Sequence, residues 1–166
     1  ADLPVRAAER ATKIFQCLAE AEASVHGIDV SNVHFHEVGA ADSIVDIVAA
    51  CVALELLGGD CIRRSEIPLG NGVIQCEHGQ LPPPAPATVQ LLEGINVVAS
   101  ANPGEATTPT AAAVLTTLAE SFGPMPAMRI SSVGLGAGTR EDGPLPNLLR
   151  VFLGETSDDS DCDELV

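Results

Sequence analysis

The densest group of side chains that could do chemistry lies within thirteen residues and contains two imidazoles and three carboxylates. Its members are His34, His36, Glu37, Asp42 and Asp46. On an extended segment the two histidines project to the same side, while Phe35 between them points toward the core. Imidazole and carboxylate ligands together suit a first-row divalent metal. The pattern therefore predicts a metal site formed by these five residues.

Asp46 adds weight to this prediction. It stands in a stretch, 42–57, that is apolar nearly all round, and such a pattern predicts a helix buried on every side. An unpaired carboxylate would be costly there, so we expect a metal, a histidine, an arginine or helix-end amides beside it. The alternative is that Asp42 only caps the helix and that the histidines are satisfied groups of the core.

A second pair of chemically capable residues is Cys76 and His78, which share one side of a predicted strand. Thiolate and imidazole are softer ligands and suit nickel, copper or zinc. The same pair could act catalytically, as a nucleophile with its base. A structural role for both residues is the competing interpretation.

Two further segments could bind an anion. Thr108 and Thr110 stand at the start of a predicted helix, where backbone N–H groups face outward. The run GLGAGTR contributes Gly136, Gly138 and Arg140, a glycine-rich loop whose backbone can approach a phosphate with a guanidinium as counter-charge. It is not a dinucleotide-binding fingerprint, because no helix pattern follows it. A plain helix start and a tight turn are the alternatives.

The elements that must position these residues alternate irregularly between helices and strands. The predicted helices are 3–26, 42–57, 86–93 and 108–120, and the predicted strands are 61–68, 72–77, 96–99, 128–133 and 148–153. This mixture predicts an α+β fold of about four helices packed with small mixed sheets. We expect one unit over 1–154, helical to about residue 58 and mixed from about 60, followed by an acidic disordered tail or linker over 155–166.

Composition excludes several classes of protein. The net charge of −15 and the scarcity of bases argue against nucleic-acid binding through a basic surface. No apolar run reaches the roughly 18 to 20 residues of a membrane-spanning helix. The five cysteines are scattered and include no CxxC motif, so we expect reduced thiols and a cytoplasmic location.

Four stretches of the sequence, 33–58, 68–94, 104–130 and 133–155, resemble the LarC family of nickel insertion proteins. The most specific are HFHEVGAADSIVDI (34–47) and CEHGQLPPPAPAT (76–88). The resemblance implies an enzyme, a nickel chelatase or cyclometallase of the lyase class. It inserts Ni²⁺ into pyridinium-3,5-bisthiocarboxylic acid mononucleotide in a reaction that uses CTP with Mn²⁺ or Mg²⁺. The product is the nickel-pincer cofactor of lactate racemase.

Two features of that family are missing from this sequence. Its members begin with a segment like DCFSGISGDM, and they continue into a C-terminal domain that resembles a CTP-binding part. We therefore expect this chain to be most of the first domain, with the CTP-binding domain as its partner. Missing N-terminal strands would expose a sheet edge and favour a homo-oligomer.

Three functions remain open at this stage. The first is nickel insertion, with the 34–46 group as the main metal site and Cys76 and His78 as a soft second site. The second is a non-catalytic, metal-free scaffold or oligomerisation module that presents substrate to a separate nucleotide-binding domain. The third, a hydrolase built on Cys76 and His78, has no oxyanion-hole motif to support it.

Overall fold

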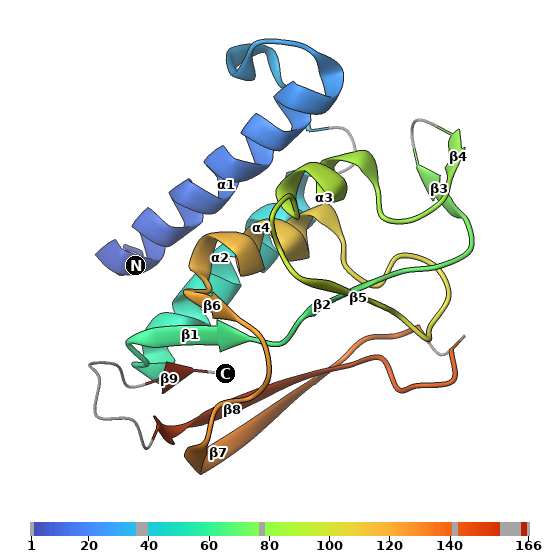
Figure 1. Ribbon diagram of the computed structural model, residues 1–166. Helices are drawn as coiled ribbons and strands as arrows, with labels where there is room; N and C mark the ends of the chain where they lie inside the picture. Colours follow the sequence, from blue (N-terminus) through green and yellow to red (C-terminus); the bar gives the residue numbers. More distant parts are fainter. Residues whose placement is uncertain (1, 36–39, 77–78, 141–142, 157–163, 166) are drawn as a thin grey trace.

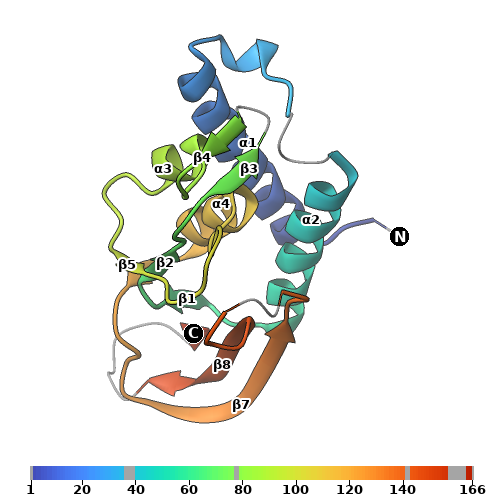
Figure 2. The same ribbon diagram turned by 90° about the vertical axis from the view of Figure 1, so that its right-hand side faces the viewer.

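In the part of the chain that the structure describes, four α-helices pack together on one side of small sheets, which confirms the predicted α+β class (Figures 1 and 2). The computed structural model describes residues 2–35, 40–76, 79–140, 143–156 and 164–165. Within these ranges, no helix combines the length and the apolar character that a membrane crossing requires.

Helix α1, Val5–His26, is the central element of the helical layer, and it packs against each of the other three helices. Its buried side chains recur every three or four residues and include Ile14 and Leu18, which are fully buried. The helix ends at Gly27, whose φ of 63° is left-handed and favours glycine. The predicted bounds of this helix are thus confirmed to within two residues.

Helix α2, Ala40–Leu57, is only half buried, so the prediction of burial on every side is wrong. Ile47 and Cys51 are fully buried where α2 meets α1 and α4, whereas Val45 is 64% and Leu56 80% exposed. An apolar sequence pattern shows which faces of a helix can be buried. Which of those faces are buried depends on the elements that pack against the helix. The helix also begins before the two residues expected to cap it, Asp42 and Ser43, which therefore lie in its first turn.

Helices α3, Pro86–Leu91, and α4, Pro109–Leu118, begin as the sequence predicts. Each has a proline in its first turn, where a missing N–H costs nothing. The Thr108 hydroxyl caps α4 by accepting a hydrogen bond from the Ala111 N–H at 3.2 Å. Both helices pack against α1, and Leu91, Ala112 and Ala113 complete the core.

Among the described residues, the strands form one five-stranded sheet and two two-stranded sheets. The large sheet has the order β6-β1-β9-β8-β7; the small sheets are the parallel pair β2-β5 and the antiparallel pair β3-β4. Their bounds are β1 Cys61–Arg64, β2 Ile67–Leu69, β3 Ile74–Cys76, β4 Gly79–Leu81, β5 Val97–Ala99, β6 Ser121–Phe122, β7 Met128–Ala137, β8 Leu148–Thr156 and β9 Glu164–Leu165. The single strand predicted over 61–68 is therefore two strands that belong to different sheets.

The hairpin of β7 and β8 is longer than predicted. Gly134 and Gly136 pair with Val151 and Leu149 inside it, so they belong to a strand and not to a glycine-rich loop. Period-two alternation is weak where small residues follow one another, which explains the early predicted end of β7. Most of the predicted acidic tail lies outside the described residues, whereas Glu164–Leu165 form β9 beside β8.

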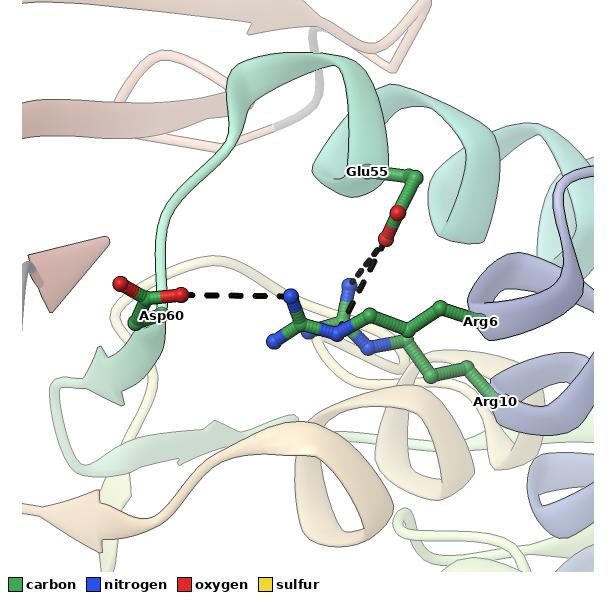
Figure 3. Close-up of polar contacts among 4 residues, drawn as sticks. All are labelled: Arg6, Arg10, Glu55 and Asp60. Carbon is green, nitrogen blue, oxygen red and sulfur yellow. Dashed lines mark ion pairs between the residues drawn. The ribbon is translucent and has the colours of Figure 1, made fainter.

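A group of ion pairs fixes α1 against the end of α2 (Figure 3). The Glu55 carboxylate on α2 lies 3.8 Å from the Arg6 guanidinium and 3.7 Å from that of Arg10, both on α1. Arg6 also lies 4.0 Å from Asp60, in the turn that leads to β1. Because the Arg10 side chain is only 13% exposed, solvent screens its pairing less than at the open surface.

Replacing Glu55 with glutamine should lower the free energy of unfolding by about 1–2 kcal/mol. The change keeps the shape of the side chain but leaves two guanidinium groups facing a neutral amide. Urea unfolding followed by circular dichroism measures the effect. The matched control is Asp60→Asn. Because the Asp60 side chain is 63% exposed, this change should lower the free energy of unfolding by less than about 0.5 kcal/mol. Equal losses in the two variants would contradict this account.

Candidate metal and ligand sites

The predicted metal group spans the connection into α2 and the first half of that helix. His34 is exposed and Phe35 packs against the core, as alternation predicts. His36 and Glu37 lie outside the described residues. Asp42 and Asp46 follow on α2, four residues apart, and both are exposed. The described residues contain no group of three or more His, Cys, Asp or Glu side chains arranged to hold a metal ion.

The exposure of Asp46 corrects one step of the sequence argument. A carboxylate in contact with water carries no desolvation cost, so its presence in an apolar helix does not require a partner. Asp42, in the first turn of α2, is in addition favoured by the positive end of the helix dipole. The role of both residues as metal ligands stays a prediction that rests on residue type and spacing.

Cys76 is the last residue of β3 and pairs with Gly79, the first residue of β4. Its half-buried thiol donates to the Gly79 carbonyl oxygen at 3.5 Å. His78 lies outside the described residues. The structure thus places the thiol at the end of the β3–β4 hairpin, which projects from the helical layer (Figure 1).

Two adjoining cavities, of about 410 and 290 Å³, open where the loop after β5 meets the loop between β7 and β8. They share Arg140 and residues 145–148, and the smaller cavity is also lined by Asn102 and Glu105. This is a concave surface with a guanidinium, side-chain amides and a carboxylate along its wall, which suits a small polar ligand.

Arg140 holds the two loops of this pocket together. Its guanidinium donates to the carbonyl oxygens of Pro103 and Glu105, the latter at 2.9 Å. Asn102 reinforces the junction from the other loop: its amide donates to the Leu145 carbonyl and accepts from the Leu145 N–H, both at 3.0 Å. Gly104, at φ 74°, lies against the Arg140 guanidinium, where an added Cβ would come within 2.9 Å of it.

The residues predicted to bind an anion do not all meet at this pocket. Arg140 and Gly138 line it, whereas Thr108, Thr110 and Gly136 do not line either of the two described cavities. At Gly138 the backbone lies against the Asn147 side-chain amide, whose nitrogen is 2.2 Å from the position that an added Cβ would take. Asn102 and Glu105 were not identified from the sequence, because isolated polar residues in a loop give no local signal of a pocket.

Arg63 and Arg64 are adjacent bases in the sequence, but Arg64 is buried and does not contribute to a basic surface. Arg64 is 8% exposed, lies over the Phe122 ring at 3.6 Å and donates to the Ser65 carbonyl oxygen. Burial lowers the pKa of this guanidinium to about 10, because the charged form is desolvated. This arginine is part of the packing between β1 and β6.

Glu22 and His26 form a pair near the end of α1 that was not among the residues predicted to form a site. The Glu22 carboxylate lies 3.5 Å from His26 Nε2, and the side chains are 6% and 29% exposed. A signal was available: Glu22 follows the buried Leu18 by four residues and so occupies an apolar position of the helix, with a histidine four residues further on.

Comparison with known proteins agrees with the resemblance drawn from the motifs. A family model described as "Nickel insertion protein" matches residues 1–166. A protein of Geobacillus kaustophilus named as a pyridinium-3,5-bisthiocarboxylic acid mononucleotide nickel insertion protein is 55% identical over 89% of this chain and 36% of its own length. A protein of Geobacter sulfurreducens assigned to nickel insertion is 53% identical over 95% of this chain and 41% of its own length.

The chain thus spans about two fifths of the length of the curated relatives it matches. No solved structure matches it. A family match over the whole chain, together with identities above one half, leads to one conclusion: the chain belongs to the nickel insertion protein family.

Proposed function

We propose that this chain is the nickel-handling part of a protein that inserts Ni²⁺ into a pyridinium bisthiocarboxylic acid mononucleotide. The observation that carries the proposal is the relative of that name, 55% identical over 89% of the chain. Nickel is a substrate in this reaction. The overall conversion is that of a nickel chelatase or cyclometallase, a lyase, and its product would serve as the nickel-pincer cofactor of lactate racemase.

In this proposal the 34–46 group receives the metal. Imidazole and carboxylate ligands bind Ni²⁺ well enough to capture it, and their mixed character permits its release to the sulfur atoms of the substrate. Cys76 and His78 would form the softer site on the hairpin, from which nickel passes to those sulfur atoms.

The pocket around Arg140 is proposed to bind the anionic end of the substrate. A mononucleotide carries a phosphate, and a guanidinium held in place by two carbonyl oxygens presents its charge without further ordering. In a chain of net charge −15, such a local cation is needed to bring an anionic substrate to the surface.

CTP and its Mn²⁺ or Mg²⁺ are proposed to act through the remainder of the longer protein, as a CTP-binding domain that partners this one. The scattered cysteines fit a cytoplasmic protein with reduced thiols. Self-association through the sheet edge at β7 would make the assembly a homo-oligomer.

A calorimetric Ni²⁺ titration of the metal-stripped chain at neutral pH tests the metal part of the proposal, with Zn²⁺ and Mn²⁺ as comparisons. We expect stoichiometric Ni²⁺ binding that weakens at least tenfold, about 1.4 kcal/mol, in the double variant His34→Ala/His36→Ala. The Cys76→Ala/His78→Ala variant is measured beside it and should lose less.

The outcomes of this titration distinguish a metal-binding role of the chain from a scaffold role. Unchanged binding in the His34/His36 variant would remove these histidines from the site. If the folded chain binds no Ni²⁺, nickel capture belongs to another part of the longer protein, and this chain is then a scaffold that presents substrate. Formation of a stable complex with the CTP-binding part, seen by size-exclusion chromatography, would support that second function.

A further inference from the structure

Asn71 joins two segments that leave the small β2–β5 sheet at the same end. The two strands are parallel, so the link after β2 and the loop after β5 begin side by side (Figure 1). The Asn71 side-chain amide donates to the carbonyl oxygens of Ser100 and Asn102, at 3.0 and 3.1 Å. Its backbone N–H donates to the Gly104 carbonyl oxygen at 3.1 Å, and its carbonyl oxygen accepts from the Gly104 N–H at 2.8 Å. Asn71 therefore makes four hydrogen bonds to one short loop.

The chemistry of an asparagine side chain fits this attachment. A primary amide has two N–H donors and can bond two carbonyl oxygens at once, whereas a carboxylate of the same shape can donate to neither. Asn71 is exposed and lies outside the hydrophobic core, so core packing does not explain this residue type. The two segments are in close contact, because an added Cβ at Gly70 would overlap the Gly104 carbonyl oxygen.

The loop that Asn71 holds is the one that positions Arg140. The Arg140 guanidinium donates to the carbonyl oxygens of Pro103 and Glu105, the two neighbours of Gly104 in the chain. Gly104 has a φ of 74°, a left-handed conformation that favours glycine. Successive carbonyl oxygens of this turn therefore serve two partners: that of Gly104 bonds Asn71, and those on either side of it bond the guanidinium.

Asn71 lines neither of the two described cavities, whereas Arg140 lines both. An effect of Asn71 on a ligand in this pocket therefore has to pass through the loop. Without the side-chain amide of Asn71, the carbonyl oxygens of Ser100 and Asn102 would lose these two hydrogen bonds and the loop would gain conformational freedom. The guanidinium would then have to be ordered when the ligand binds, and that ordering lowers the affinity.

We propose that Asn71 is a positioning residue of the anion pocket: it holds the loop whose carbonyl oxygens orient the Arg140 guanidinium toward the phosphate of the mononucleotide. The inference rests on the proposed function, which places the anionic end of the substrate at Arg140. Strand β3 begins at Ile74, shortly after Asn71, so this anchor also lies at the root of the hairpin that carries Cys76.

The test is calorimetric titration of the chain with nicotinic acid mononucleotide, a pyridinium mononucleotide. We expect Asn71→Asp, which keeps the shape of the side chain but removes both donors, to weaken binding about tenfold, or about 1.4 kcal/mol. The matched control is Asn32→Asp, an exposed asparagine in the 3₁₀ turn Val30–Asn32, which adds the same charge and should leave binding unchanged. Equal affinity in Asn71→Asp and in the unaltered chain would overturn the inference and leave the proposed Arg140 site in place.

A double-mutant cycle separates positioning from a general loss of structure. The neutral variant Asn71→Ala should weaken binding at least about threefold in the unaltered chain and have no further effect in a chain that already carries Arg140→Ala. Equal losses in the two backgrounds would overturn the inference, because the asparagine would then act independently of the guanidinium. Asn71→Ala also covers the case in which Asn71→Asp fails to fold, and circular dichroism checks the folding of every variant. If Arg140→Ala alone binds as tightly as the unaltered chain, the proposed phosphate site is wrong and the inference falls with it.

Discussion

Replacing Leu18 with alanine is expected to lower the free energy of unfolding by about 3–4 kcal/mol, the largest loss for any single truncation considered. Leu18 is fully buried in the core cluster, in the helix that packs against all three of the others. Removing a methine and two methyl groups there forfeits their transfer free energy and leaves a cavity, because helices fixed on several sides cannot close around it.

Urea unfolding followed by circular dichroism measures this loss. The control is Lys13→Ala, an exposed position on the same helix, which should change the free energy of unfolding by less than about 0.5 kcal/mol. A loss below about 1 kcal/mol in the leucine variant would mean that α1 is not the centre of the core. The urea midpoint also sets the conditions under which binding by the other variants can be compared.

Replacing Arg140 with alanine is expected to weaken binding of a pyridinium mononucleotide by about 10- to 100-fold, or about 1.4–2.8 kcal/mol. Two effects add in this variant. The guanidinium that would meet the phosphate is lost, and the hydrogen bonds to the carbonyl oxygens of Pro103 and Glu105, which hold one wall of the pocket, are lost with it.

Calorimetric titration with the mononucleotide measures the change, and two further variants separate its causes. Arg140→Lys keeps the charge but not the planar fork, so it should recover only part of the affinity. Arg129→Ala removes another exposed arginine of the β7–β8 hairpin, one that pairs with Glu155, and should leave binding unchanged. Equal affinity in the unaltered chain and in Arg140→Ala would exclude this pocket as the phosphate site.

Local features of the fold could be predicted from the sequence because they depend on residues a few positions apart. Gly27 and Gly58 end α1 and α2 as expected, since each has a positive φ that favours glycine. Thr108 and Pro109 begin α4 as a cap and a first-turn proline. The family was also identified from the sequence, because its motifs are runs of many specified residues.

The candidate sites were predictable only in part. Residue type and spacing predicted His34 and Asp42 as metal ligands and Arg140 as an anion-binding residue. All three lie within the described residues. Spacing could not show that Asp46 is exposed, because the apolar pattern of α2 is the same whether one face or all faces are covered. Nor could it show that Asn102 joins its loop to the loop at Leu145, 43 residues further along the chain.

The sequence by itself therefore determined the helices to within two residues at each end, the α+β class and the family, all of which follow from local geometry or from long specific motifs. The tertiary structure decided which strand pairs with which, that Arg140 connects two loops, and that Glu22 is buried beside His26. These are contacts between distant segments or consequences of packing. The free energy of such contacts depends on which surfaces the fold brings together. The order of residues along the chain does not show which surfaces meet.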